Sequence, residues 1–144
     1  HAYVFGEHGD SSFIPWSLTN IAGVPMEEYC ADQDHADLDE EEIINEVRTA
    51  GAEVIKRKGA TFYAIAMSVN KICDSILRDS NNIITVSTMM NGKYGIDDVC
   101  LSLPCVIGSN GIEREVSPKM TDTEIEKLRA SAAALRSVID QIQF

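Results

Sequence analysis

The residues best suited to chemistry form the pentad Gly6–Asp10, which reads Gly-Glu-His-Gly-Asp and follows the apolar run Ala2–Phe5. Such a run predicts a strand, so His8 is expected at a strand end. The flanking glycines tolerate the tight or positive-φ backbone that lets a polar side chain leave a strand and face a cleft. Imidazole exchanges a proton near neutral pH, which makes His8 the candidate acid and base of this chain.

Three interpretations of His8 follow from the residues around it. It is a hydrogen-bonded turn residue, a metal ligand, or a group that shuttles a proton with the help of a carboxylate elsewhere. A metal site would need Asp10, His1 or His35 as further ligands, but the chain has no His-x-x-x-His spacing, and alternate residues on a turn rarely converge. We therefore expect no metal, and the two glycines weaken the turn interpretation.

Composition limits the class of protein. With 144 residues and 44% hydrophobic content, the chain is large enough for one domain with a real core. A net charge of -11 disfavours nucleic acid and anionic membranes as partners, because both require clustered cations. No apolar run approaches the length of a membrane span. Because His1 is not a methionine and an apolar run follows it at once, we expect a longer protein that continues upstream.

The four cysteines and the acidic stretch give no sign of a metal centre. The cysteines show no Cys-x-x-Cys pair, which fits reduced thiols inside a cell; they are Cys30, Cys73, Cys100 and Cys105. A calcium loop starting at Asp32 would place Ile43 where a glutamate is required. Instead, Asp39 is suited to cap a helix, with Glu42 three residues later as in a capping box.

Helical spacing predicts long helices in the middle and at the end of the chain. Apolar residues recur at helical intervals from Glu40 to Leu77, and Gly59 either divides two helices or bends one, which would put Thr61 at a helix beginning. A terminal helix is predicted by a capping box from Thr121 to Glu124. Its apolar stripe comprises Ile125, Leu128, Ala132, Leu135, Ile139 and Ile142.

Between these helices the period changes to that of strands. Residues 83–90, 99–107 and 112–116 are rich in β-formers, and Asn91-Gly92 and Asn110-Gly111 supply turn signals, which predicts an antiparallel meander. Residues 11–24 predict a further strand or bulged edge strand. The terminal helix is expected to cover the meander, so the fold class is α+β.

Five blocks of sequence carry a family resemblance. They read HAYVFGEHGDSS at residues 1–12, WS and NIAGVP within 16–25, EVIKRKGATFYAIAMSV at 53–69, YGIDDV at 94–99 and NGIER at 110–114. The chain resembles the C-terminal, substrate-binding half of NAD-dependent L-lactate dehydrogenases, in the lactate/malate dehydrogenase family. The likeness extends over residues 1–144, which the resemblance implies are a single substrate-binding domain.

The resemblance implies roles for three residues. His8 matches the catalytic histidine, which takes the hydroxyl proton as L-lactate is oxidised and returns it as pyruvate is reduced. Thr61 matches a threonine that lines the substrate pocket, and Ile65 an apolar contact to the nicotinamide ring of NAD. Without the resemblance, Thr61 would be interpreted as a helix cap and Ile65 as a core residue.

The resemblance also implies partners and missing parts. His1 matches a histidine that helps bind the effector fructose-1,6-bisphosphate in bacterial members. The family's assemblies imply a homo-oligomer, a dimer or a homotetramer, in the cytoplasm, working in glycolysis and pyruvate fermentation. No Gly-x-Gly-x-x-Gly motif follows a strand, so no Rossmann half is expected here. The orienting carboxylate and the substrate-binding arginines of the family also lie upstream, and we expect the isolated chain to be inactive.

Two alternatives stay open. The first is another 2-hydroxy-acid dehydrogenase, acting on malate or hydroxyisocaproate; the block GEHGDSS and Trp16-Ser17 favour lactate over malate. The second is a non-catalytic module whose apolar faces serve only subunit assembly. Substitution of His8 separates these classes, because an assembly module does not need its imidazole.

Overall fold

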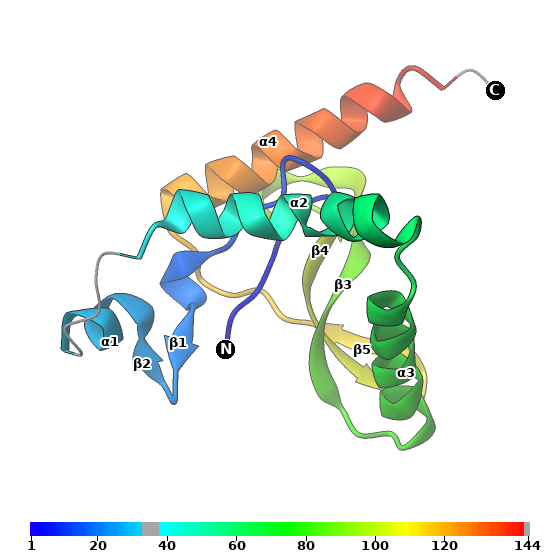
Figure 1. The fold of residues 1–144 in the computed structure, drawn as a ribbon. Coiled ribbons are helices and arrows are strands. Elements are labelled where there is room, and N and C mark those ends of the chain that lie inside the picture. The colour runs from blue at the N-terminus through cyan, green and yellow to red at the C-terminus, as the bar shows by residue number, and fades with distance from the viewer. Residues whose placement is uncertain (33–37, 143–144) are drawn as a thin grey trace.

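The computed structural model describes residues 1–32 and 38–142, and Figure 1 shows how its elements are arranged. The helices are α1 (Met26–Asp32), α2 (Glu40–Lys58), α3 (Tyr63–Leu77) and α4 (Asp122–Ile139), with 3-10 turns η1 (Trp16–Leu18) and η2 (Lys93–Gly95). The strands are β1 (Asn20–Ile21), β2 (Val24–Pro25), β3 (Asn82–Asn91), β4 (Asp97–Gly108) and β5 (Gly111–Glu115). Within these ranges no helix has the length and apolar character needed to cross a membrane.

The main sheet is the predicted meander. Its strand order is β3-β4-β5, and both pairings are antiparallel. The register places Val86 opposite Leu103 and Ile84 opposite Cys105. The turns fall where the sequence predicted them, with Gly92 at φ 78° after β3 and Gly111 at φ 89° at the start of β5. The α+β class is confirmed.

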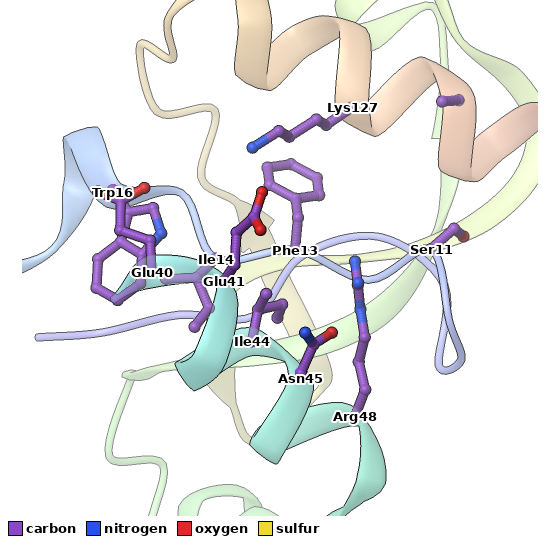
Figure 2. Close-up of a pocket in the computed structure, with 11 residues that line it drawn as sticks. Ser11, Phe13, Ile14, Trp16, Glu40, Glu41, Ile44, Asn45, Arg48 and Lys127 are labelled. Carbon is purple, nitrogen blue, oxygen red and sulfur yellow. The ribbon is translucent and has the colours of Figure 1, made fainter. Parts of the chain in front are cut away.

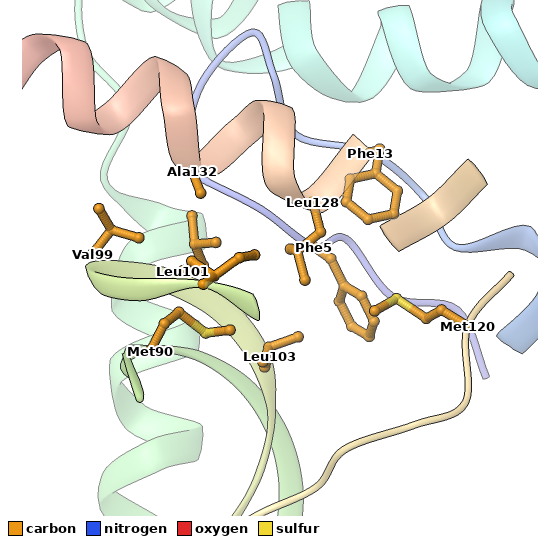
Figure 3. Packing of buried hydrophobic residues seen from close by; sticks show 10 residues of the cluster. Phe5, Phe13, Met90, Val99, Leu101, Leu103, Met120, Leu128 and Ala132 are labelled. Atoms are coloured by element: carbon orange, nitrogen blue, oxygen red, sulfur yellow. The ribbon is translucent and has the colours of Figure 1, made fainter. Parts of the chain in front are cut away.

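The core lies between this sheet and α4 (Figure 3). Leu101 and Leu103 of β4 and Leu128 of α4 are completely buried, and they form one cluster with Phe5. Burial of leucine side chains of this kind contributes roughly 1.5–3 kcal/mol each. The predicted covering of the meander by the terminal helix is therefore confirmed, although Ile142 lies beyond the end of α4 and is 54% exposed.

The N-terminal segment differs from the prediction. Ala2–Phe5 is no strand; single antiparallel bridges join Phe5 to Phe13 and Gly6 to Ser102. The backbone of Gly6 has φ 97°, which ends the extended conformation after one bridge. Residues 11–24 likewise form no continuous strand, because η1 follows Pro15 and after it come only the two-residue β1 and the start of β2, which pair with each other.

The two central helices are separate. Asp39 caps α2 by accepting a hydrogen bond from the Glu42 N–H at 2.9 Å, as predicted. Gly59 adopts a left-handed conformation with φ 79° and ends the helix. Neither helix buries its apolar stripe: no described residue of α2 is buried, and in α3 only Ser75 is.

Helix α1 was not predicted, because its seven residues offer little apolar periodicity. The acidic stretch that precedes Asp39 lies partly outside the described residues, and His35 is among those outside.

Glu124 joins the start of α4 to the segment that follows His8. It completes the predicted capping box with Thr121, and it also accepts hydrogen bonds from the Ser17 N–H at 3.0 Å and the Ser17 hydroxyl at 2.5 Å. Burial raises the pKa of Glu124, but the hydrogen bonds from Ser17 and Thr121 together outweigh it, and the pKa lies below its ordinary value.

A lowered pKa in the folded state gives Glu124 a defined pH effect on stability. The ionised carboxylate stabilises the fold above its unfolded pKa, near 4.5, and this stabilisation is lost as the pH falls through the folded pKa. We expect Glu124→Gln to lower the free energy of unfolding at pH 7 by about 1–3 kcal/mol. The loss should shrink below pH 4, as measured by urea unfolding.

Glu126→Gln is the matched control, because Glu126 is an exposed glutamate on the same helix. It should leave the unfolding free energy nearly unchanged at both pH values. Equal losses in the two variants would contradict the role assigned to Glu124.

Candidate active site

His8 sits on a short exposed loop, residues 6–12, here called the His8 loop. The bridges at Phe5 and Gly6 fix its beginning, and the Ser12 N–H donates to the Gly9 carbonyl at 3.1 Å to close a turn. His8, Gly9 and Asp10 are exposed, whereas Gly6 and Ser12 are buried. The two ends of the loop are therefore held in the protein, while the imidazole at its middle is exposed.

Gly6 allows the loop to approach α4 closely. A Cβ at this position would lie 2.7 Å from the Ser131 Oγ, inside normal contact distance, and φ 97° disfavours any side chain there. The prediction that a glycine beside His8 provides a special backbone conformation is confirmed at Gly6; Gly9 does not have a positive φ.

A hydrogen-bond network holds the loop against α4. The Glu7 N–H donates to the Ser131 Oγ at 2.8 Å. Ser11 donates to the Glu7 Oε1 from its N–H at 3.1 Å and from its hydroxyl at 2.8 Å, and its Oγ lies 3.0 Å from the Ser131 Oγ. The residue preceding His8 is thus fixed through both its backbone and its side chain.

A second anchor comes from α2. The Arg48 guanidinium donates through Nε, at 3.0 Å, and through a terminal nitrogen to the carbonyl of Ser12. The loop is held on one side by α4 and on the other by α2.

Two of the anchoring residues, Ser11 and Arg48, line a cavity of about 560 Å³ between α2, α4 and residues 11–16, and His8 and Ser131 are not among its lining residues. Arg48 of α2 and Lys127 of α4 extend toward it from different elements, as Figure 2 shows. Its lining residues are Ser11, Phe13, Ile14, Trp16, Glu40, Glu41, Ile44, Asn45, Arg48, Lys127 and Ala130.

The imidazole of His8 is available for a ligand. Among the residues that the structure describes, none hydrogen-bonds its ring, and no group of three His, Cys, Asp or Glu side chains is placed to hold a metal ion. The arrangement suits a group that meets a substrate oxygen at an exposed surface and exchanges a proton with it.

The other predicted site residues lie on different elements. Thr61 is half-buried in the link between α2 and α3, and Ile65 lies in the first turn of α3, 58% exposed. The helix cap is Phe62, so Thr61 is no cap, and Ile65 is no core residue. The described residues contain no hydrogen bond joining His8 to Thr61.

His1 pairs with the start of β1. Its backbone nitrogen donates to the Asn20 carbonyl at 2.6 Å, and its carbonyl accepts from the Asn20 N–H at 2.9 Å. The residue itself is exposed. His1 is therefore held by its backbone with its side chain at the surface.

The architecture defines an α+β domain in which a three-stranded antiparallel sheet packs on a terminal helix, with a histidine displayed on an anchored loop. A family model for the lactate/malate dehydrogenase alpha/beta C-terminal domain matches residues 1–143. The chain belongs to this family.

Known relatives agree in sequence and in fold. The L-lactate dehydrogenase of Acetivibrio thermocellus is 45% identical over 141 residues, which cover 96% of this chain and 44% of that protein. A lactate dehydrogenase from a Medee basin deep-sea metagenome library has a crystal structure with TM-score 0.92 and 37% identity, covering 97% of this chain and 45% of that one. The chain spans about half the length of the curated relatives it matches.

One solved structure bears on the cofactor. Malate dehydrogenase from Archaeoglobus fulgidus, in complex with NADH, has TM-score 0.84 and 37% identity to this chain, covering all of this chain and 44% of that one. The fold is thus shared by lactate and malate dehydrogenases.

Sequence reasoning missed the residues that anchor the loop. Ser131 is completely buried on α4, directly before Ala132 and three residues after Leu128. A polar residue within the predicted apolar stripe was the available signal, because a buried hydroxyl needs a partner. Nothing in the sequence around Arg48 or Ser17 indicated their partners, which lie 36 and 107 residues away.

Gly6→Ala tests the close approach to α4. The variant should be less stable because the new methyl group meets Ser131 and because alanine is strained at φ 97°. Strain at positive φ costs about 1–2 kcal/mol, and overpacking adds about 1–3 kcal/mol. Urea unfolding gives the loss.

Gly111→Ala separates the two contributions. Gly111 has φ 89°, but a Cβ there would meet nothing within 4 Å, so this variant carries the strain alone. Similar losses in both variants would show that the approach of Gly6 to Ser131 carries no stability.

Proposed function

We propose that residues 1–144 form the C-terminal, substrate-side domain of a longer NAD-dependent L-lactate dehydrogenase. The observation that carries the proposal is the exposed His8 on a loop that α2 and α4 hold from both sides. Membership of the lactate/malate dehydrogenase family supports it, as do the L-lactate dehydrogenases 45% and 43% identical to the chain.

In this proposal His8 is the proton donor and acceptor. Neutral imidazole accepts the hydroxyl proton of L-lactate during oxidation, and imidazolium returns it to the carbonyl oxygen during reduction of pyruvate. Imidazolium also stabilises the negative charge that develops on that oxygen. The bound nicotinamide cofactor would supply or accept the hydride.

Thr61 and Ile65 suit the roles proposed for them. A half-buried hydroxyl in the α2–α3 link can donate to a polar substrate group and is not used as a helix cap. The exposed side chain of Ile65 offers an apolar surface of the kind that packs against a nicotinamide ring. Most of the NAD site would lie in the other half of the enzyme.

The exposed apolar residues of α2 and α3 support assembly with other chains or domains. Apolar residues that are 39–85% exposed follow α2, α3 and the link between them: Val47, Val54, Ile55, Phe62, Tyr63, Ile65, Met67, Val69 and Leu77. An exposed apolar surface of this extent indicates a contact site. We propose that it packs against the nucleotide-binding half and further subunits of a homo-oligomer, a cytoplasmic tetramer or dimer. The same surface favours the second candidate, a domain that serves assembly alone.

Substitution of His8 distinguishes these functions. In the complete enzyme, His8→Asn should lower kcat for pyruvate by about a hundredfold to ten-thousandfold, because the proton donor is lost. Steady-state kinetics with pyruvate, oxaloacetate and 2-oxoisocaproate measure the effect, and pyruvate should give the highest kcat/KM.

The control is the isolated 144-residue chain, which should show no lactate-dependent NADH formation. Unchanged turnover in a folded His8→Asn enzyme would leave only the assembly role. A higher kcat/KM for oxaloacetate or 2-oxoisocaproate would assign the enzyme to malate or hydroxyisocaproate.

His1 provides a separate proposal of regulation by fructose-1,6-bisphosphate. An exposed imidazolium can bind a phosphate group of the effector. We expect the effector to activate the complete enzyme and His1→Asn to weaken that response. Titration with the bisphosphate that changes neither the kinetics nor the His1 chemical shifts would contradict this proposal.

A further inference from the structure

We propose that Ser131 of α4 is a positioning residue for His8. This inference rests on the proposed function of His8 as the proton donor and acceptor. Ser131 touches neither a substrate nor the imidazole; it acts through Glu7, which precedes His8 in the chain.

The Ser131 hydroxyl is buried, and its described hydrogen-bond partners all belong to the His8 loop. The residue is 0% exposed and lies among the core-facing residues of α4, near Leu128 and Ala132. A hydroxyl withdrawn from water costs free energy unless it is hydrogen-bonded. Its described partners are the Glu7 N–H and the Ser11 hydroxyl, which both belong to the His8 loop.

The network forms a closed ring that starts and ends at Glu7. Each serine hydroxyl has one proton to donate. The protons are satisfied when the Glu7 N–H donates to Ser131, Ser131 donates to Ser11 across 3.0 Å, and Ser11 donates to the Glu7 carboxylate at 2.8 Å. Ser131 is the member of this ring that belongs to a helix rather than to the loop.

The ring sets the direction in which the chain enters His8. The Glu7 N–H fixes the peptide between Gly6 and Glu7 on α4, and the Glu7 carboxylate fixes Ser11 on the far side of His8. Hydrogen bonds that lead to a single buried oxygen, the Ser131 Oγ, therefore position both ends of the segment that carries the imidazole. Proton transfer requires the donor within hydrogen-bond reach of the substrate oxygen. Loss of the Ser131 hydrogen bonds is therefore expected to displace the imidazole of His8 from that position.

The test is Ser131→Ala in the complete enzyme. We expect kcat for pyruvate to fall by about 10-fold to 100-fold, because small displacements of reacting groups have effects of this size. KM should change much less, since Ser131 does not touch the substrate. Hydrogen–deuterium exchange should show faster exchange of the Glu7 amide.

Ser75→Ala is the matched control. Ser75 is also 0% exposed, but its hydroxyl serves the end of α3, where it donates to the Lys71 carbonyl and accepts from Asn82. This variant should lose stability while kcat and Glu7 exchange stay at their original values. Equal kcat in folded Ser131→Ala and Ser75→Ala enzymes would overturn the proposal.

Ser11→Ala decides the question if Ser131→Ala does not fold. Ser11 is only partly buried, and its removal opens the same ring without a buried cavity. We expect a smaller fall in kcat in the same direction; unchanged kcat would overturn the proposal. The proposed function of His8 is tested by a different variant: activity retained by His8→Asn in the same enzyme would contradict that function, whatever the result for Ser131→Ala.

Discussion

The contact of α4 with β4 and Phe5 is the constraint on which the rest of the structure depends. Leu128 is completely buried with Leu101 and Leu103, and this contact determines where the polar residues of α4 lie. Four residues before Leu128, Glu124 meets Ser17; three residues after it, Ser131 meets the His8 loop. One helix, docked by apolar burial, thus supplies two of the hydrogen-bond partners for a segment that has little regular structure.

Local signals in the sequence were sufficient for much of this architecture. The turn glycines Gly92 and Gly111, the capping box at Thr121 and the left-handed Gly59 each act within a few residues, so their effects could be predicted from the sequence around them. The meander and the terminal helix follow from these signals. Helix α1 has too short an apolar pattern to be predicted in the same way.

The N-terminal segment could not be predicted in this way. Its conformation depends on partners far along the chain, among them Ser102 for Gly6, Arg48 for Ser12 and Glu124 for Ser17. An apolar run such as Ala2–Phe5 carries no information about where such partners lie. His8 could be identified from the sequence by its chemistry, but the residues that hold its loop could be identified only in the structure. Among them, Ser131 alone had a signal in the sequence, as a polar residue within an apolar stripe.

The distance in sequence between Glu7 and Ser131 has a consequence for biosynthesis. These residues lie 124 positions apart, and a ribosome makes the chain from its N-terminus. The loop is synthesised before its hydrogen-bond acceptor, which emerges only after all three strands of the main sheet and half of α4 have been made. During this interval the loop lacks its anchor on α4. A nascent chain that stops before Ser131 therefore carries His8 on a loop that lacks the hydrogen bond from Glu7 to Ser131.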